Sequence, residues 1–138
     1  MKSFRHQEGI ALLEALIATV LLAIGLLGAI GLQARAYSAL NESSMRAEAT
    51  MASEKLIGIM TNNVGNEGEF VLAAGGTPKA SLKVWYDETV KQIPGAVIVI
   101  NVTDVAQGKQ VDATITWTRK AGDKPNVHAV STVLRTSS

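Results

Sequence analysis

The feature that most constrains this chain is an apolar run of 23 residues near its N-terminus, from Ile10 to Leu32. The run contains one charged side chain, Glu14, and one other polar side chain, Thr19. At about 1.5 Å per residue, a helix of this length extends for roughly 34 Å, which is enough to cross a hydrocarbon core of about 30 Å. The run therefore predicts a helix that spans a membrane.

The residues before the run predict which way this helix is oriented. Lys2 and Arg5 lie in the first nine residues, and basic residues next to a membrane helix are retained in the cytoplasm. We therefore expect residues 1–9 to stay in the cytoplasm and everything after Leu32 to lie across the membrane.

Two ordinary interpretations of the run account for only part of it. A removable secretory signal would have an apolar stretch of about 7 to 15 residues before a cleavage site such as Ala34-Arg35-Ala36. This run is longer, and a carboxylate inside it costs on the order of 2.5 to 3.5 kcal/mol on insertion. A plain single-pass anchor has the right length, and Glu14 would then extend to the lipid headgroups.

A third interpretation uses the order of the residues around the start of the run. Glycine followed by an apolar stretch with glutamate as its fifth residue, here Gly9-Ile10-Ala11-Leu12-Leu13-Glu14, resembles the class III signal of type IV prepilins. The resemblance implies that a prepilin peptidase cuts between Gly9 and Ile10 and N-methylates Ile10. It also implies that Glu14 acts in assembly, where its carboxylate pairs with the amino terminus of a neighbouring subunit.

Beyond Leu32 the pattern becomes amphipathic. Residues 33–60 contain no proline and one glycine, Gly58, so the helix is expected to continue until Thr61-Asn62-Asn63 ends it. Apolar residues at spacings of three and four form one stripe: Met45, Ala49, Ala52, Leu56 and Ile59 or Met60. This half of the helix is therefore expected to pack against a globular domain.

A loop and a second helix are expected next. Residues 61–77 are rich in Asn, Gly and Glu, which is typical of a loop. Thr77 is predicted to cap a helix that has Pro78 in its first position and stops at Pro94-Gly95. Its apolar stripe consists of Leu82, Trp85 or Tyr86, Val90 and Ile93. We interpret Trp85 as a core residue.

The C-terminal part of the chain has the period of β-strands. Three β-branched runs, 95–105, 110–119 and 127–135, are separated by short connections, which favours an antiparallel meander. In the second run Val111, Ala113, Ile115 and Trp117 alternate with polar residues. The predicted fold is α+β: a long N-terminal helix, membrane-spanning in its first half, packed on a three-stranded antiparallel sheet with one short extra helix. This is the pilin fold.

More of the chain is similar to one branch of this family. Residues 24–36 (IGLLGAIGLQARA), Met60 with Asn62 or Asn63, and the helix before the strands resemble PilV-type minor pilins. The resemblance implies three parts: a leader peptide at 1–9, a transmembrane and assembly half of the helix at 10–32, and a periplasmic pilin domain at 33–138.

The same resemblance implies a location, a role and partners. It places the protein in the bacterial inner membrane as a single-pass protein, in the tip of a type IV pilus, or in both. Its role would be to help initiate assembly or to cap the pilus. The expected partners are the prepilin peptidase, other minor pilins and the pilus assembly platform.

Composition argues against several other classes of function. Thirteen basic and twelve acidic residues, with six aromatic ones, provide neither the charge nor the rings for nucleic-acid binding. The absence of cysteine excludes a disulfide and a cysteine nucleophile. The sequence has no Ser-His-Asp spacing, P-loop or HExxH motif. We therefore expect no enzymatic activity, no metal site and no cofactor.

Two alternative functions remain open from the sequence. A minor pseudopilin of a type II secretion system would share the N-terminal signal and a domain of similar size. A membrane-anchored periplasmic binding module would have the same topology but would keep its leader.

Overall fold

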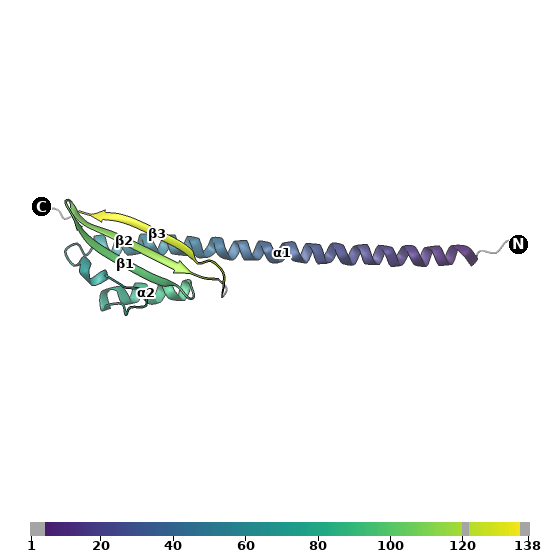
Figure 1. Ribbon diagram of the computed structural model, residues 1–138, viewed down its shortest axis with the longest axis horizontal. Coiled ribbons are helices and arrows are strands. Elements are labelled where there is room, and N and C mark those ends of the chain that lie inside the picture. Colours follow the sequence, from purple (N-terminus) through teal and green to yellow (C-terminus); the bar gives the residue numbers. More distant parts are fainter. Residues whose placement is uncertain (1–4, 120–121, 136–138) are drawn as a thin grey trace. The chain divides into compact units, whose positions relative to one another are not determined.

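The computed structural model describes residues 5–119 and 122–135 and has an α+β fold, as predicted (Figure 1). Its elements in chain order are α1 (Arg5–Thr61), the 3-10 helix η1 (Glu67–Phe70), α2 (Ala80–Gln92), β1 (Val97–Val105), β2 (Gly108–Trp117) and β3 (Asn126–Leu134). The chain divides into two compact units between Asn41 and Glu42. Because α1 runs through this boundary, each unit contains part of that helix.

The first unit presents apolar side chains on every side of α1. From residue 9 to residue 41 every position is exposed except Ser38, which is half-buried. Thirteen large apolar side chains between Ile10 and Leu32 each expose more than half of their surface. Complete burial of one such side chain contributes about 1.5 to 3 kcal/mol. Because these side chains are only a little more than half exposed, covering the whole set would contribute on the order of 10 to 20 kcal/mol.

That figure is comparable to the whole stability of an ordinary domain, about 5 to 15 kcal/mol. This part of α1 therefore needs an apolar environment. Within the described residues, α1 is the one helix long and apolar enough to cross a membrane. By length and composition it fits a membrane span or a signal sequence.

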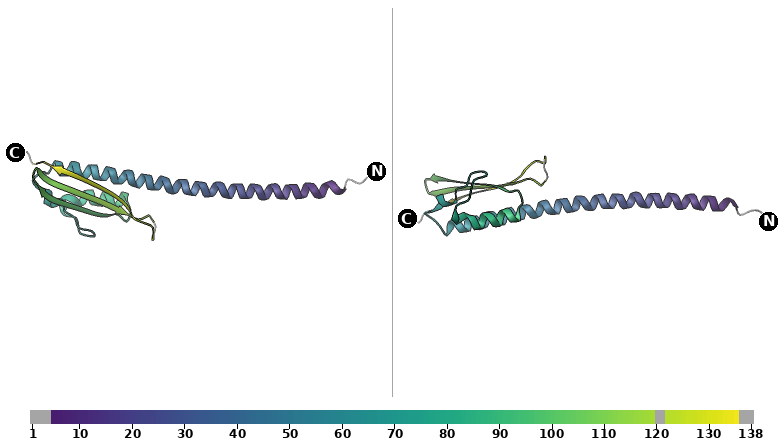
Figure 2. Two further views of the ribbon diagram at one scale, coloured as in Figure 1. Left: turned by 45° about the horizontal axis from the view of Figure 1, so that its top comes forward. Right: turned by 90° about the horizontal axis from the view of Figure 1, so that it is seen from below.

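The second unit has two layers. The sheet has the order β1-β2-β3, both pairs of neighbours are antiparallel, and α2 lies on the same side of it as the last part of α1 (Figure 2). The β1–β2 connection is only Ala106-Gln107, and Gly108 follows it with φ of +140°. A Cβ atom on Gly108 would lie 2.0 Å from the carbonyl oxygen of Leu134. Only glycine therefore allows β2 to begin so close to the end of β3.

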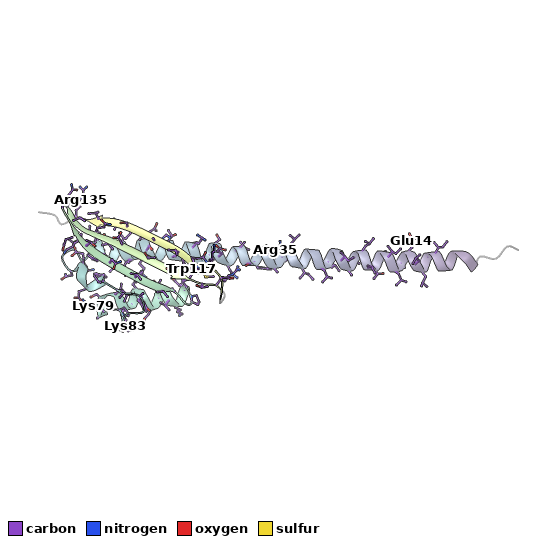
Figure 3. The ribbon with its side chains drawn as sticks, viewed as in Figure 1. Glu14, Arg35, Lys79, Lys83, Trp117 and Arg135 are labelled. Carbon is purple, nitrogen blue, oxygen red and sulfur yellow. The ribbon has the colours of Figure 1, made fainter. Side chains whose placement is uncertain are left out.

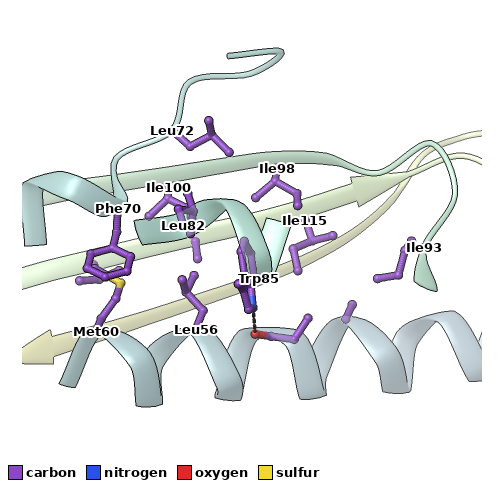
Figure 4. Packing of buried hydrophobic residues seen from close by; sticks show 14 of the residues in the cluster. Leu56, Met60, Phe70, Leu72, Leu82, Trp85, Ile93, Ile98, Ile100 and Ile115 are labelled. Carbon is purple, nitrogen blue, oxygen red and sulfur yellow. Dashed lines mark hydrogen bonds between the residues drawn. The ribbon is translucent and has the colours of Figure 1, made fainter. Parts of the chain in front are cut away.

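The core forms where the predicted stripe of α1 meets the sheet (Figure 4). Four residues of that stripe are buried: Ala49, Ala52, Leu56 and Met60. The alternation predicted for β2 is also confirmed, since Val111, Ala113, Ile115 and Trp117 are buried. From α2, Trp85 donates its indole N–H to the carbonyl oxygen of Ala52 at 2.8 Å, which confirms that it is a core residue.

The segment between α1 and α2 differs from the prediction. Residues 61–77 are not only a loop, because they contain η1 and Leu72, whose backbone pairs with Ile100 of β1. Phe70 and Leu72 complete the core. η1 and the bridge at Leu72 lie beside β1, which is distant in sequence, so no periodic pattern within residues 61–77 predicts them.

The predicted N-cap of α2 is wrong. The cap residue is Lys79, it forms no side-chain capping bond, and the helix begins at Ala80, after both Thr77 and Pro78. Lys79 instead reaches back to η1, where its Nζ lies 3.2 Å from the Gly68 carbonyl oxygen and 3.1 Å from a Glu69 carboxylate oxygen. A side-chain capping bond contributes only about 1 kcal/mol. The contacts of Lys79 with Gly68 and Glu69 can therefore outweigh a cap at Thr77 and move the start of the helix.

The position of the core predicts how the chain can be shortened. A fragment that begins at Gln33 or Ala34 retains every buried residue of the second unit and lacks the exposed apolar run. We expect it to be a soluble monomer whose circular dichroism shows both helix and sheet. Sedimentation should give a monomer mass, whereas aggregation would mean that the domain needs a partner to cover an apolar face.

Candidate functional site

The residues of the predicted processing site lie in α1. Gly9 and Ile10 are helical and exposed, and Ile10 has 66% of its surface accessible. No atom lies within 4 Å of the position that a Cβ on Gly9 would occupy. A glycine inside a helix costs about 1 kcal/mol relative to alanine. The described part of the fold therefore gains nothing from glycine at this position.

The carboxylate of Glu14 lies on an apolar face of α1. The residues around it on this face are Ile10, Leu13, Ile17, Ala18 and Leu21. The side chain projects from the helix (Figure 3). Among the described side chains, none forms an ion pair or hydrogen bond with it. Thr19 differs, because its hydroxyl donates to the carbonyl oxygen of Ala15 within the same helix. Glu14 is therefore the polar side chain of the run that has no partner among the described residues.

Helix geometry relates Glu14 to the predicted cleavage point. Residues four apart are separated by about 6 Å along the axis and share a face, so Ile10 and Glu14 lie one above the other. A cut after Gly9 would create an ammonium group at Ile10. The result would be a cation and an anion about one turn apart on one apolar face.

The second unit contains a buried carboxylate that the sequence did not identify. Glu67 is only 2% exposed, and its Oε1 accepts the backbone N–H of Gly65 at 2.7 Å. That hydrogen bond, together with one from its own backbone N–H, holds the pKa of Glu67 below its ordinary value despite burial. Lys109 lowers the pKa of Glu67 further. The apolar Phe70 and Leu72 are the sequence signal that this segment is buried.

Two other groups among the described residues have shifted pKa values, and both lie on the sheet. The carboxylate of Asp104 raises the pKa of Lys109 by hydrogen bonding and charge. Hydrogen bonds from Ser131 and then Gln110 lower the pKa of Asp112. Glu67 and Lys109 influence each other's pKa through their opposite charges, whereas the pKa of Asp112 is shifted by partners of its own. Within 5–119 and 122–135, no group of three His, Cys, Asp or Glu residues could hold a metal ion.

The architecture is pilin-like: a long N-terminal helix, apolar in its first half, is followed by a short helix and a small antiparallel sheet. No protein-family model matches the chain, and neither a curated protein nor a solved structure is significantly similar to it. The residues of α1 therefore provide the evidence about function.

Glu67 predicts a specific dependence of stability on pH. Because the folded state lowers the pKa of Glu67, its ionised form stabilises the fold above the pKa of the unfolded chain, and this contribution is lost as the pH falls through the folded pKa. At pH 7, Glu67→Gln should reduce the free energy of unfolding by about 1 to 3 kcal/mol.

Below about pH 4.3, the ordinary pKa of an unfolded glutamate, the difference in free energy of unfolding between wild type and Glu67→Gln should narrow as the pH falls toward the lower pKa of folded Glu67. Urea unfolding followed by the near-UV signal of the two buried tryptophans measures both values. Glu69→Gln is the matched control, since Glu69 is exposed and pairs with Lys79 at the surface. A pH-independent difference for Glu67→Gln would contradict the assignment.

Proposed function

We propose that this chain is a minor pilin of a type IV pilus that is processed after Gly9. The prepilin peptidase would cut between Gly9 and Ile10 and methylate the new amino group. The mature chain would be held in the inner membrane by residues 10–32, with residues 33–138 in the periplasm. The observation that carries the proposal is the unpaired carboxylate of Glu14 on an apolar helix face, one turn from Ile10.

The charge of Glu14 would need a compensating charge inside a membrane. An unpaired carboxylate inside a membrane costs on the order of 2.5 to 3.5 kcal/mol, so insertion alone would favour an apolar residue. A pair is stable in such a place only if both charges leave water together and fit each other well. The amino group exposed by cleavage would supply the second charge, and it would do so only in the processed chain.

A pair between neighbouring subunits would also set their stagger. If two parallel helices are displaced by about one turn, the amino terminus of one lies level with Glu14 of the other. Any other displacement would leave both charges unpaired in an apolar surrounding. Glu14 would thus select one register, while the thirteen large apolar side chains supply contact that is indifferent to register.

Within a pilus, we expect the chain to help initiate assembly or to cap the filament. Its partners would be the other minor pilins and the pilus assembly platform. Nucleic acid is not expected among them, and we expect no catalytic activity. A minor pseudopilin of a type II secretion system is the alternative that shares every step of this argument. Co-purification with secretion components instead of pilus components would favour it.

The first prediction concerns processing. Gly9→Val should leave the leader attached, because the peptidase reads the residue before the cut, whereas wild type should begin at Ile10 with one added methyl group. The space around Gly9 is open, so valine should not disturb the helix. Intact-mass analysis of membrane fractions distinguishes the two forms.

Gly28→Val is the matched control for this experiment, because Gly28 lies in the same helix and also has open space around it. It should be processed normally. Cleavage also removes Lys2, Arg5 and Glu8, which leaves eleven basic and eleven acidic side chains from the original thirteen and twelve. If Met1 persists in cells with active peptidase, the chain is a membrane-anchored module and not a pilin.

The second prediction concerns Glu14. Glu14→Leu should remain membrane-inserted and processed, yet should co-purify poorly with other minor pilins from detergent. Removing one member of a buried ion pair typically costs about 3 to 5 kcal/mol, so the association should weaken by a factor on the order of 100 or more. The number of surface pili should fall as well.

Thr19→Val is the control for Glu14→Leu, since the Thr19 hydroxyl is already bonded within α1. It should assemble as wild type does. If Glu14 simply extends to the headgroups, Glu14→Leu should insert better and assemble equally well. Undiminished co-purification of Glu14→Leu would therefore reject the assembly role.

A further inference from the structure

A single positive charge follows the apolar run of α1. Between Glu14 and Glu42 the sequence contains one charged residue, Arg35. Arg35 is exposed, and among the described side chains none forms an ion pair or a hydrogen bond with it. Its guanidinium group therefore has its charge and its five N–H donors available for a ligand.

An exposed aromatic side chain lies two residues further along the helix. Tyr37 has 69% of its surface accessible. Its side chain has an apolar ring and a polar hydroxyl at the tip, and tyrosines of this kind are enriched where a membrane helix leaves the hydrocarbon core. Arginine suits the same layer, because its stem is apolar and its head is charged. Arg35 and Tyr37 are therefore both typical of the boundary between lipid and water.

Helix geometry gives the depth of both residues relative to the apolar run. Arg35 and Tyr37 follow Leu32 by three and five residues, which is about 4.5 and 7.5 Å along the axis. The headgroup layer on each side of a bilayer is roughly 5 to 7.5 Å thick, because the whole bilayer measures about 40 to 45 Å and its hydrocarbon core about 30 Å. With Leu32 at the end of the hydrocarbon core, both residues lie in this layer.

The directions of the two side chains distinguish a lipid layer from a protein partner. Successive residues of a helix are rotated by about 100°, so residues two apart point to nearly opposite sides. A protein that packs on one side of α1 would contact Arg35 or Tyr37, but not both. A headgroup layer surrounds the helix and would contact both. The large side chains of the apolar run are likewise exposed around the whole helix, which also fits a surrounding lipid.

The direction of insertion gives the charge of Arg35 a cost that a ligand would offset. In the orientation proposed above, Arg35 lies just past the periplasmic end of the run, where the positive-inside bias disfavours basic residues. The sequence has no acidic residue between positions 15 and 41 that could compensate. The phosphate group is the anion that a phospholipid bilayer offers at this depth, and it accepts two parallel N–H bonds from a guanidinium group.

We propose that Arg35 binds the phosphate group of a membrane phospholipid on the periplasmic side, and that Tyr37 contacts the headgroup layer from the other side of α1. Together the two residues would fix the depth of the helix before assembly. The inference rests on the membrane location proposed above, to which it adds a lipid partner. It does not depend on the pairing of Glu14 or on cleavage after Gly9.

The test measures contact between arginine and lipid phosphorus. The full chain, labelled with ¹³C at the guanidinium carbon of every arginine, is placed in phosphatidylcholine vesicles without inorganic phosphate. Solid-state NMR then records the dephasing of this carbon by ³¹P. We expect Arg35→Gln to lose part of the dephasing that wild type shows. The difference between the two samples is the quantity to compare, because Arg5, before the run, is labelled as well.

Two controls accompany this measurement. The Arg46 guanidinium already donates to Glu42 and to Asn126, at 2.9 Å in both cases, so Arg46→Gln should show the dephasing of wild type. The second control uses vesicles of a galactolipid that has no phosphate, in a buffer that contains inorganic phosphate. Wild type and Arg35→Gln should not differ there. A difference would show that Arg35 binds free phosphate, which would overturn the lipid assignment.

Two further readouts concern Tyr37 and the depth of the helix. With ¹³C at the ring carbon that carries the tyrosine hydroxyl, Tyr37→Leu should lose the dephasing by ³¹P, since the other tyrosine, Tyr86, packs against the core. The chain has no cysteine, so Gln33→Cys carries a single nitroxide whose exposure to oxygen and to a water-soluble nickel complex reports depth. Adding Arg35→Leu should move this probe about 3 Å deeper, the length of two helical residues. Arg35→Lys keeps the charge and should leave the depth unchanged.

Failure of the lipid site is distinguishable from failure of the proposed function. Equal dephasing in wild type and Arg35→Gln, an equal loss in Arg46→Gln, an unchanged tyrosine signal in Tyr37→Leu, or an unchanged depth in Arg35→Leu would overturn the lipid site alone. Release of wild type from the vesicles by alkaline carbonate would mean that α1 is not inserted. That result would overturn both the lipid site and the proposed membrane location.

Discussion

A helix that is apolar on every side cannot remain in water, and this constraint organises the chain. The first part of α1 exposes thirteen large apolar side chains, whose burial is comparable in free energy to the folding of a whole domain. The second part of the same helix is apolar on one side only, and that side forms the core with the sheet. One continuous helix thus joins a segment that needs an apolar environment to a domain that folds around its own core.

The charge of Glu14 is unfavourable in an apolar environment, so its presence in this run needs a physical explanation. The other polar side chain of the run, Thr19, satisfies its hydroxyl within the helix, whereas Glu14 has no described partner. A buried charge of this kind is destabilising when it is alone. It can set the register of two helices only when an opposite charge lies at a fixed position beside it. The proposed cleavage after Gly9 would create such a charge four residues away. Processing would then create the positive charge, and assembly would bring it next to Glu14.

The sequence predicted the helices and strands whose apolar residues repeat at a regular spacing. The stripe through Ala49, Leu56 and Met60 and the alternation of β2 arise from local spacing, and both are confirmed. The pairing of Leu72 with Ile100 joins segments that are distant in sequence, so local patterns could not reveal it. Glu67 is held by a local hydrogen bond from Gly65, and the only sequence signal of its burial is the nearby pair of apolar residues, Phe70 and Leu72. At the candidate site, the sequence placed Ile10 and Glu14 on one helix face, and Glu14 has no partner among the described residues.

Pairing of Glu14 with a neighbouring amino terminus can be measured by identifying which nitrogen lies next to its carboxylate in the assembled state. Solid-state NMR can detect dephasing between the ¹³C-labelled carboxylate of Glu14 and ¹⁵N-labelled amino termini supplied only on the partner pilins. Our account predicts an intermolecular contact consistent with an ion pair, with N and O within about 4 Å. A contact found only when both labels are in the same chain, or no contact at all, would contradict it.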